Sequence, residues 1–264
     1  MIDWFYNVPL LISGTLIIVA LSLVGVAGTL VMRRFVSRML EVQHEHSGFV
    51  GTMVASIMVF YGLAVALIAV SVWETHSGVS TIASNESTAI ADLYQDVSSF
   101  PEPVRSELRS YIRDYTEYVI HEAWPVQRQG RLAPGGFPIL MEFQSRLALF
   151  EPVTEGQKAL YAEALQAYNQ LIERRCLRLE AAETHLSGVL WLVIVMGAFI
   201  SLFSTAFFRV EDVRLHAIMV SLLASFIGLI IVMVLAYDRP FCGQLGVGPD
   251  AYELVYDQLM NEKK

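Results

Sequence analysis

The chain has 264 residues, 55% of them hydrophobic, and a formal net charge of −8. Soluble domains usually run about 45–50% apolar, so the excess favours a membrane protein. The acidic balance argues against a nucleic-acid partner, which would require a basic face. The chain has only two cysteines, Cys176 and Cys242, which argues against a disulfide scaffold or a cysteine-rich zinc module.

Four stretches reach the length of about 20 apolar residues that a transmembrane helix needs. They cover residues 8–32, 48–72, 186–208 and 215–237, and none of them contains Lys, Arg, Asp or Glu. Backbone polar groups in lipid must be bonded within the segment, so each stretch is predicted to be a helix. The sequence therefore predicts an all-α membrane protein with four transmembrane helices, embedded in a lipid bilayer.

The chain is expected to alternate between membrane and extramembrane parts. We divide it into transmembrane helices 1 and 2 (residues 1–73), an extramembrane helical domain (74–185), transmembrane helices 3 and 4 (186–238), and a C-terminal tail with a short amphipathic helix (239–264). Beyond the second span, seam positions follow one another at spacings of four and three residues: Val79, Ala83, Glu86, Ile90, Leu93 and Val97. This pattern predicts that the second span continues as one helical rod to about Ser98.

Three further helices are predicted in the extramembrane domain. One helix covers residues 103–123 and ends at the Trp124-Pro125 dipeptide, and a short helix covers residues 138–150. Residues 154–157 form a T-x-x-Q capping box, which opens a long helix. No breaker separates that helix from the third span, so we expect it to enter the membrane directly. The domain would then be continuous with spans two and three.

Basic residues gather in the two short loops that connect span one to span two and span three to span four: Arg33, Arg34, Arg38, Arg209 and Arg214. The positive-inside rule places these loops in the cytoplasm, and both termini and the helical domain on the outer side. The first span is not expected to be a cleaved signal, because Asp3 precedes it and basic residues follow it. Trp4, Trp73 and Tyr237 fall at the outer ends of spans, as interface anchors should.

Glu86 occupies a seam position where an apolar side chain is expected, and a buried carboxylate needs a partner. It lies about 20 Å beyond Trp73 along a helix. Arg174 and Arg175 lie at the same height above the third span, and Arg178 lies about one helical turn closer to it. Two interpretations stay open. Glu86 forms a structural ion pair with one of these arginines, or it forms a ring of carboxylates at the axis of an oligomer.

One face of the second span carries positions at spacings of three and four residues: Thr52, Ser56, Val59, Leu63, Ala66, Val70 and Glu74. In several copies around an axis, this face would line a pore with an apolar gate. Glu74 would then be a charged pore mouth; the alternative is that it simply extends into water. The His44-Glu45-His46 tripeptide is interpreted as a solvated loop, because i,i+2 residues do not share a helix face. No cofactor, metal or catalytic arrangement is predicted.

A set of short motifs runs in order along nearly the whole chain: Gly48-Phe49, Tyr61, Val72-Trp73-Glu74, Asn85-Glu86-Ser87, Leu93-Tyr94, Tyr115, Val119, Glu122-Ala123-Trp124-Pro125, Arg175 to Arg178, Leu190-Trp191, and Asp238-Arg239-Pro240-Phe241-Cys242-Gly243. Together they resemble the bacterial bestrophin-like family. Ala123 departs from the family pattern, which is similar to E-W-P, and this puts the turn after the second helix in doubt. The resemblance implies a bacterial inner-membrane protein with a remote link to bestrophins, which are oligomeric anion channels with a pore lined by the second span. Bestrophins keep their helical domain in the cytoplasm, against the charge count above.

The sequence is compatible with two functions. The first is a homo-oligomeric ion channel or pore, because four uncharged helices in one subunit leave little room for a polar pathway. The alternative is a non-conducting sensor, scaffold or accessory protein whose outer helical domain binds a partner. The bestrophin resemblance favours anions, whereas Glu74 and Glu86 favour cations. An enzyme is least favoured, because no convergent set of His, Asp and Glu residues lies near the interface.

Overall fold

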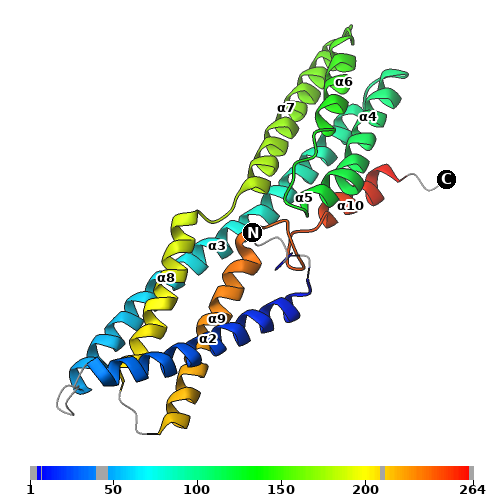
Figure 1. The fold of residues 1–264 in the computed structure, drawn as a ribbon. Helices are drawn as coiled ribbons and strands as arrows, with labels where there is room; N and C mark the ends of the chain where they lie inside the picture. Colours follow the sequence, from blue (N-terminus) through cyan, green and yellow to red (C-terminus); the bar gives the residue numbers. More distant parts are fainter. Residues whose placement is uncertain (1–4, 7, 40–46, 209–211, 262–264) are drawn as a thin grey trace. The chain divides into compact units, whose positions relative to one another are not determined.

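The computed structural model describes residues 5–6, 8–39, 47–208 and 212–261 (Figure 1). Regular structure in these ranges is entirely helical, and four helices are long and apolar enough to cross a membrane. The predicted fold class, an all-α membrane protein with four transmembrane helices, is therefore confirmed. Trp4, the His44-Glu45-His46 tripeptide and Arg209 lie outside the described residues.

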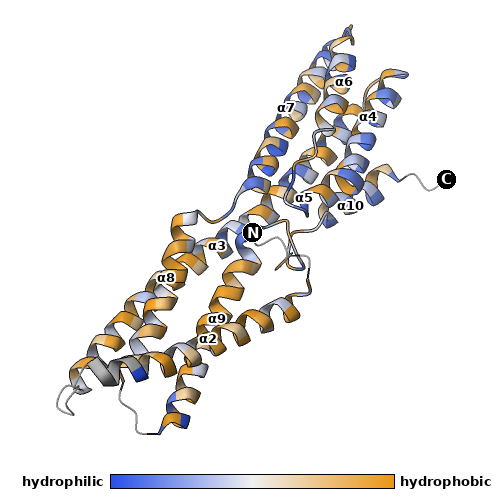
Figure 2. Cartoon of the chain, viewed as in Figure 1, coloured by the Kyte–Doolittle hydropathy of each residue, from blue (hydrophilic) through white to orange (hydrophobic). Residues whose placement is uncertain are grey.

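The chain divides into two compact units. The first, which we call the span unit, comprises residues 1–74 and 185–238. The second, the helical unit, comprises residues 75–184 and 239–264, so the C-terminal segment belongs to the same unit as the segment between spans two and three. Figure 2 shows that the helices of the span unit are predominantly hydrophobic along their length, whereas those of the helical unit alternate between hydrophobic and hydrophilic residues.

The span unit is built from α2 (Leu10–Met39), the first half of α3 (Ser47–Val97), α8 (Gly188–Ser204) with the 3₁₀ turn η3 (Thr205–Phe207), and α9 (Val213–Asp238). The α2 backbone stays helical through residues 33–39, which the sequence analysis treats as part of a loop. A histidine at the start of α9, His216, is buried.

Small residues bring α2 and α9 close together. A Cβ added at Gly228 would lie 3.2 Å from the Cα of Ile18, and one added at Gly25 would lie 3.3 Å from the Cβ of Ala224. The hydroxyls of Ser22 and Ser225 lie 2.9 Å apart between the same helices. Lipid gives helices no hydrophobic reason to associate, so close backbone approach and interhelical hydrogen bonds supply the packing.

The helical unit contains the second half of α3, then α4 (Val104–Tyr118), the π turn η2 (Val119–Ala123), α5 (Trp124–Gln127), α6 (Gly136–Ala148), α7 (Glu155–Glu183), α10 (Asp250–Val255) and the π turn η4 (Tyr256–Met260). One apolar core joins them, and Ile90, Leu93, Leu108 and Ile112 are fully buried in it. The seam of α3 therefore faces this core. The expected rod is a single helix of 51 residues that ends at Val97.

The capping box at the start of α7 is confirmed. The Thr154 hydroxyl accepts a hydrogen bond from the Gln157 backbone N–H at 3.1 Å. The Gln157 side chain in turn accepts from the backbone N–H of Thr154. These bonds satisfy amide groups that have no partner inside the first turn of a helix.

The expectation that α7 continues into the third span is wrong. Its helix ends at Glu183, Thr184 and Ser187 adopt extended backbone conformations, and α8 begins at Gly188. Within the span unit, the Leu186 backbone N–H donates to the Asp238 carboxylate at 2.6 Å instead of to a helical carbonyl. A tertiary contact thus accompanies the break in the helix, and Ser187 and Gly188 stand at the start of the next one. The helical unit is continuous with span two only.

The sequence predicts that the second helix of the domain ends at Trp124-Pro125, and this prediction is wrong. The chain passes through the π turn η2, in which the Trp124 N–H donates to the Val119 carbonyl, and then enters α5. Pro125 is tolerated because it stands in the first turn of α5, where its missing N–H costs little. The helical path therefore extends to Gln127.

Candidate functional site: a buried ion pair and an exposed face of α3

Glu86 of α3 is 0% exposed and forms an ion pair with Arg178 of α7, which is 2% exposed. The Arg178 Nε donates to Oε2 at 2.6 Å, and its Nη2 donates to Oε1 at 3.2 Å. The Tyr115 hydroxyl of α4 donates to Oε1 at 2.7 Å. The carboxylate therefore accepts three hydrogen bonds from two other helices, as a buried charge requires.

The other two candidate arginines do not contact Glu86. The guanidinium of Arg175, which is buried, lies 5.7 Å from the centre of the Phe137 ring. Arg174 is half-buried on the same helix. The guanidinium of Arg178 also lies 5.7 Å from the Trp124 ring, in a cation–π arrangement.

Two buried tyrosines surround the ion pair. Burial raises the pKa of Tyr115 well above its usual value, and the Glu86 charge and the hydrogen bond to it act in the same direction. Burial, followed by the Glu86 charge, also raises the pKa of Tyr252 of α10 well above its usual value. The Tyr252 hydroxyl makes no hydrogen bond of good geometry with the described residues, and neither does Nη1 of Arg178.

The segment after α9 closes this cluster. The Trp124 Nε1 donates to the Val247 carbonyl at 3.0 Å. The Trp124 ring centre lies 5.4 Å from that of Phe241 and 5.2 Å from that of Tyr252. The Asp-Arg-Pro-Phe-Cys-Gly motif thus places Phe241 against the tryptophan that covers Arg178.

Tyr115, Trp124 and Tyr252 were not predicted to lie near Glu86. A signal was present, because a tyrosine on a buried face brings a hydroxyl that needs an acceptor. Nothing in the spacing of residues identifies Tyr252, which lies on a different helix more than 130 residues further on. The carboxylate is engaged by three hydrogen bonds inside the protein, which favours a structural role.

The seven candidate pore-lining positions all lie on a face of α3 that the rest of the chain leaves uncovered. Val59, Leu63 and Val70 are 68%, 58% and 53% exposed, and the other four are also exposed: Thr52, Ser56, Ala66 and Glu74. The opposite face packs into the span unit through Val54, Val65, Ile68, Ala69 and Val72, all of them buried. The Thr52 and Ser56 hydroxyls donate to carbonyls one turn earlier, Gly48 and Thr52.

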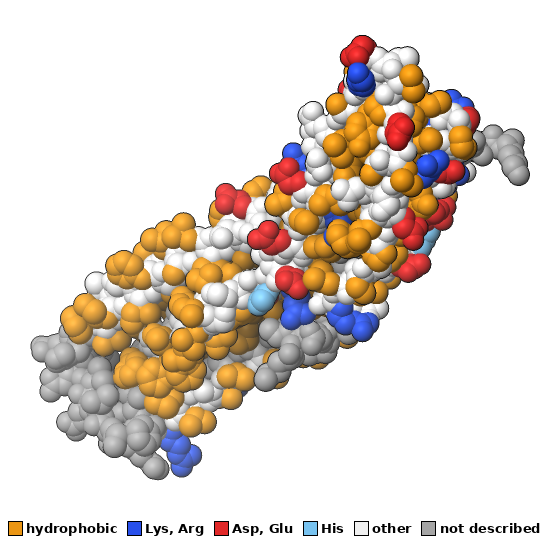
Figure 3. Space-filling model, turned by 90° about the horizontal axis from the view of Figure 1, so that it is seen from above, with side chains coloured by type: hydrophobic (Ala, Val, Ile, Leu, Met, Phe, Trp, Pro, Cys, Tyr) orange, Lys and Arg blue, Asp and Glu red, His pale blue; other side chains and the backbone are white. Residues whose placement is uncertain are grey.

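Among the described residues, no three His, Cys, Asp or Glu side chains come together in a group that could hold a metal ion. Figure 3 shows where charge lies on one face of the molecule: Asp, Glu, Lys and Arg side chains gather over the helical unit, and hydrophobic side chains dominate the span unit. A predominantly apolar surface over four long helices is what a bilayer requires.

Comparison with known proteins agrees with this architecture. A family model for a bestrophin-like domain matches residues 19–252. A crystal structure described as that of a membrane protein is similar with a TM-score of 0.63 at 10% sequence identity, covering 92% of this chain and 97% of that chain. At this identity the likeness shows the fold alone. No curated protein matches the chain.

Proposed function

Because the chain belongs to the bestrophin-like family, we propose that this multi-pass membrane protein assembles into a homo-oligomeric ion channel or pore, with α3 of each copy lining the axis. The family name supports a channel, since bestrophins are channels of this kind. We propose further that the helical unit lies outside the bilayer of a bacterial inner membrane.

The observation that carries the proposal is the uncovered face of α3. Its exposed positions run from Thr52 to Glu74 at helical spacing, on the side of the helix opposite the buried residues Val54, Val65 and Val72. Hydroxyls occupy one end of this face, apolar side chains its centre and a carboxylate the other end. This order corresponds to an entrance, a hydrophobic constriction and a charged mouth.

A single copy offers no polar path across the membrane in the part of the span unit that the structure describes. Its buried polar residues there are Ser13, Thr29, Ser201, Ser204, Thr205, His216 and Asp238. Several of these hydroxyls donate to carbonyls of their own helix, including Ser204 to Ser201 at 2.8 Å and Thr205 to Leu202 at 2.6 Å. They serve helix packing, so a conducting path requires several copies.

Glu74 and the family kinship favour permeating ions of opposite sign. A ring of carboxylates at the mouth favours cations, whereas kinship with bestrophins favours anions. Reversal potentials in asymmetric salt distinguish the two, and Glu74→Gln tests the ring directly. If Glu74 sets selectivity, Glu74→Gln shifts the reversal potential away from the cation equilibrium potential.

The decisive experiment is reconstitution of the purified protein into planar bilayers. In a Cys176→Ser background, Leu63→Cys places a thiol on the proposed pore face. Leu229→Cys on α9 is the matched control, because both leucines lie sixteen residues past the first residue of their helices and are 58% and 55% exposed. We expect a charged, thiol-reactive methanethiosulfonate to reduce the current through Leu63→Cys and to leave the Leu229→Cys current unchanged.

Two outcomes would overturn the proposal. The first is a folded protein that gives no current above that of protein-free bilayers at any voltage. The second is a current that the reagent blocks equally in both cysteine variants. Absence of current in a well-folded protein would favour the alternative, a non-conducting sensor or scaffold whose helical unit binds a partner.

A further inference from the structure

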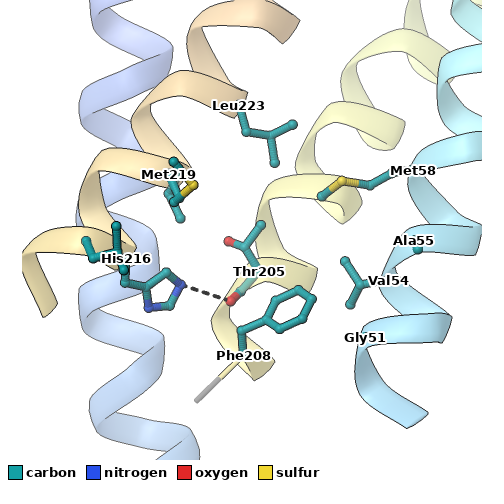
Figure 4. Close-up of a pocket in the computed structure, with 11 residues that line it drawn as sticks. Gly51, Val54, Ala55, Met58, Thr205, Phe208, His216, Met219 and Leu223 are labelled. Carbon is teal, nitrogen blue, oxygen red and sulfur yellow. Dashed lines mark hydrogen bonds between the residues drawn. The ribbon is translucent and has the colours of Figure 1, made fainter. Parts of the chain in front are cut away.

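A cavity of about 460 Å³ lies within the span unit, between α3, the end of α8 and the start of α9 (Figure 4). Val54 and Met58 line it from α3, and Met219 and Leu223 line it from α9. Figure 4 shows these side chains converging on one space, with His216 and Thr205 at its border. On α3 the cavity-lining residues lie on a different side of the helix from the proposed pore face.

The polar groups at the border are already engaged. The His216 Nε2 lies 3.2 Å from the Thr205 carbonyl oxygen, and the Thr205 hydroxyl donates to the Leu202 carbonyl. The cavity therefore presents mainly carbon to an occupant. Its volume falls within the range of about 300–1,000 Å³ that is typical of small-ligand sites.

The cavity opens to the side of the span unit, because Ala55, Leu215 and Met219 line it and are also exposed. In a membrane that side faces hydrocarbon chains. A helix from a second copy is about 10 Å across with its side chains and does not enter a space of this volume. A single acyl chain is narrow enough to enter it.

Charge at the same end of α9 points to an anionic head group. Arg214, whose side chain is exposed, directly precedes the cavity residue Leu215 in the first turn of α9. The backbone N–H groups of Arg214 and Leu215 donate to the Asp212 carboxylate, so the guanidinium is the group that this turn offers to a phosphate. Basic residues beside pockets between transmembrane helices are a known means of binding anionic lipids.

We propose that this cavity holds one acyl chain of an anionic phospholipid and that Arg214 contacts the lipid phosphate. The site requires only one copy of the chain and does not depend on conduction. It is a lipid site at the end of the span unit that carries Arg214.

The test is native mass spectrometry of the full-length protein, purified in detergent and supplied with phosphatidylglycerol or phosphatidylcholine. Gly51→Leu fills the cavity, because a Cβ at Gly51 has only the Phe208 ring near it, at 3.8 Å. Gly62→Leu adds the same side chain to the same helix, where nothing lies within 4 Å of a Cβ. Ala55→Leu is a second filling variant, should Gly51→Leu fail to fold.

We expect the unmodified protein to retain phosphatidylglycerol in preference to phosphatidylcholine. Displacing about two methylenes from the cavity should weaken retention about tenfold in Gly51→Leu and Ala55→Leu, and Gly62→Leu should bind normally. Arg214→Gln should reduce the preference for phosphatidylglycerol about fivefold while the protein still retains lipid. Equal retention by the filling variants and Gly62→Leu would refute the site, and equal retention of both lipids by the unmodified protein would refute the anionic head group.

Discussion

The Nε of Arg178 lies 2.6 Å from Oε2 of Glu86, although 92 residues separate the two along the chain. The pair joins α3 to α7 inside the core of the helical unit, and the Tyr115 hydroxyl joins α4 to the same carboxylate. One buried charge thus connects three helices, and its loss should weaken the packing of all three.

Glu86→Gln should destabilise the protein. It leaves the Arg178 guanidinium buried without a counter-charge, and removing one partner of a buried pair costs roughly 3–5 kcal/mol. The melting temperature of the detergent-solubilised protein should fall, and adding Arg178→Gln should recover part of the loss because the second unpaired charge is then gone. An unchanged or higher melting temperature for Glu86→Gln would support the other interpretation, in which repulsion between carboxylates of neighbouring copies is relieved.

Alkaline pH should weaken the helical unit through Tyr115 and Tyr252. The folded protein holds the pKa of both phenols well above that of the unfolded chain, so above about pH 10 the unfolded chain releases protons that the folded protein keeps. Stability is therefore unaffected by these groups below that pH and falls by up to about 1.4 kcal/mol per pH unit for each tyrosine above it. Melting temperatures measured from pH 8 to pH 11 check this.

Phenylalanine variants separate the two tyrosines from general alkaline damage. Tyr252→Phe removes a hydroxyl whose contact with Glu86 is poor in geometry, so it should reduce the alkaline slope and lower stability at neutral pH only slightly. Tyr111→Phe, on α4 and half-buried, serves as the control. An alkaline slope that is the same in Tyr252→Phe and in the unmodified protein would contradict the assignment.

The orientation in the membrane is predicted from Arg33, Arg34, Arg38, Arg209 and Arg214, which concentrate at the end of α2, at the start of α9 and in the connection before α9. A reporter enzyme that is active only in the periplasm, fused after Lys264, should be active. A reporter that requires the cytoplasm should be inactive at the same position. The opposite pattern would place the helical unit in the cytoplasm, as in bestrophins.

Thiol labelling should distinguish the two cysteines. Cys176 is exposed on α7 and Cys242 is buried, and neither forms a disulfide. A maleimide should therefore modify one thiol in the native, unreduced protein and two after denaturation. Cys176→Ser should abolish native labelling. Finding no reactive thiol in the denatured, unreduced protein would mean that the two form a disulfide.

The contact between α2 and α9 should not tolerate a large side chain at Gly228. A Cβ there meets the backbone of Ile18 at 3.2 Å, and overpacking typically costs about 1–3 kcal/mol. Gly228→Leu should lower the melting temperature. Gly28→Leu on α2 is the control, because nothing lies within 4 Å of a Cβ at that position, and a comparable loss in that variant would show that the effect is not one of packing.

The parts of the fold that depend on local sequence patterns could be predicted from the sequence. Uncharged apolar runs of sufficient length are enough to predict the four spans, and the seam from Val79 to Val97 is enough to predict the rod. The end of α7 is different, because it depends on the Asp238 carboxylate, which lies more than 50 residues away from Leu186. The local signal is weak, a Ser187-Gly188 dipeptide at the start of α8, and it falls inside the apolar run that predicts the third span.

Residue counts along two helices were not enough to predict the partner of Glu86. Counting residues along both helices favours Arg174 and Arg175, but side chains on a helix lean toward its N-terminus. The helices α3 and α7 run in opposite directions in the helical unit, as the neighbouring pairs Asp96–Glu163 and Glu86–Arg178 indicate. Glu86 and Arg178 therefore lean toward each other, and a difference of one turn in backbone height disappears.

The π turn η2 lets the helical path absorb one additional residue without turning the following side chains away from the core. Leu108, Ile112, Tyr115 and Val119 are fully buried at steps of four, three and four residues, and the next large side chain that is at most 1% exposed, Trp124, comes five residues later. A fifth residue in a regular α-helix would be rotated by about 100° relative to the fourth. The wider turn instead keeps Trp124 in phase, so that its indole still covers Arg178. Ala123 can therefore be present in this chain while the geometry around the buried charges is preserved.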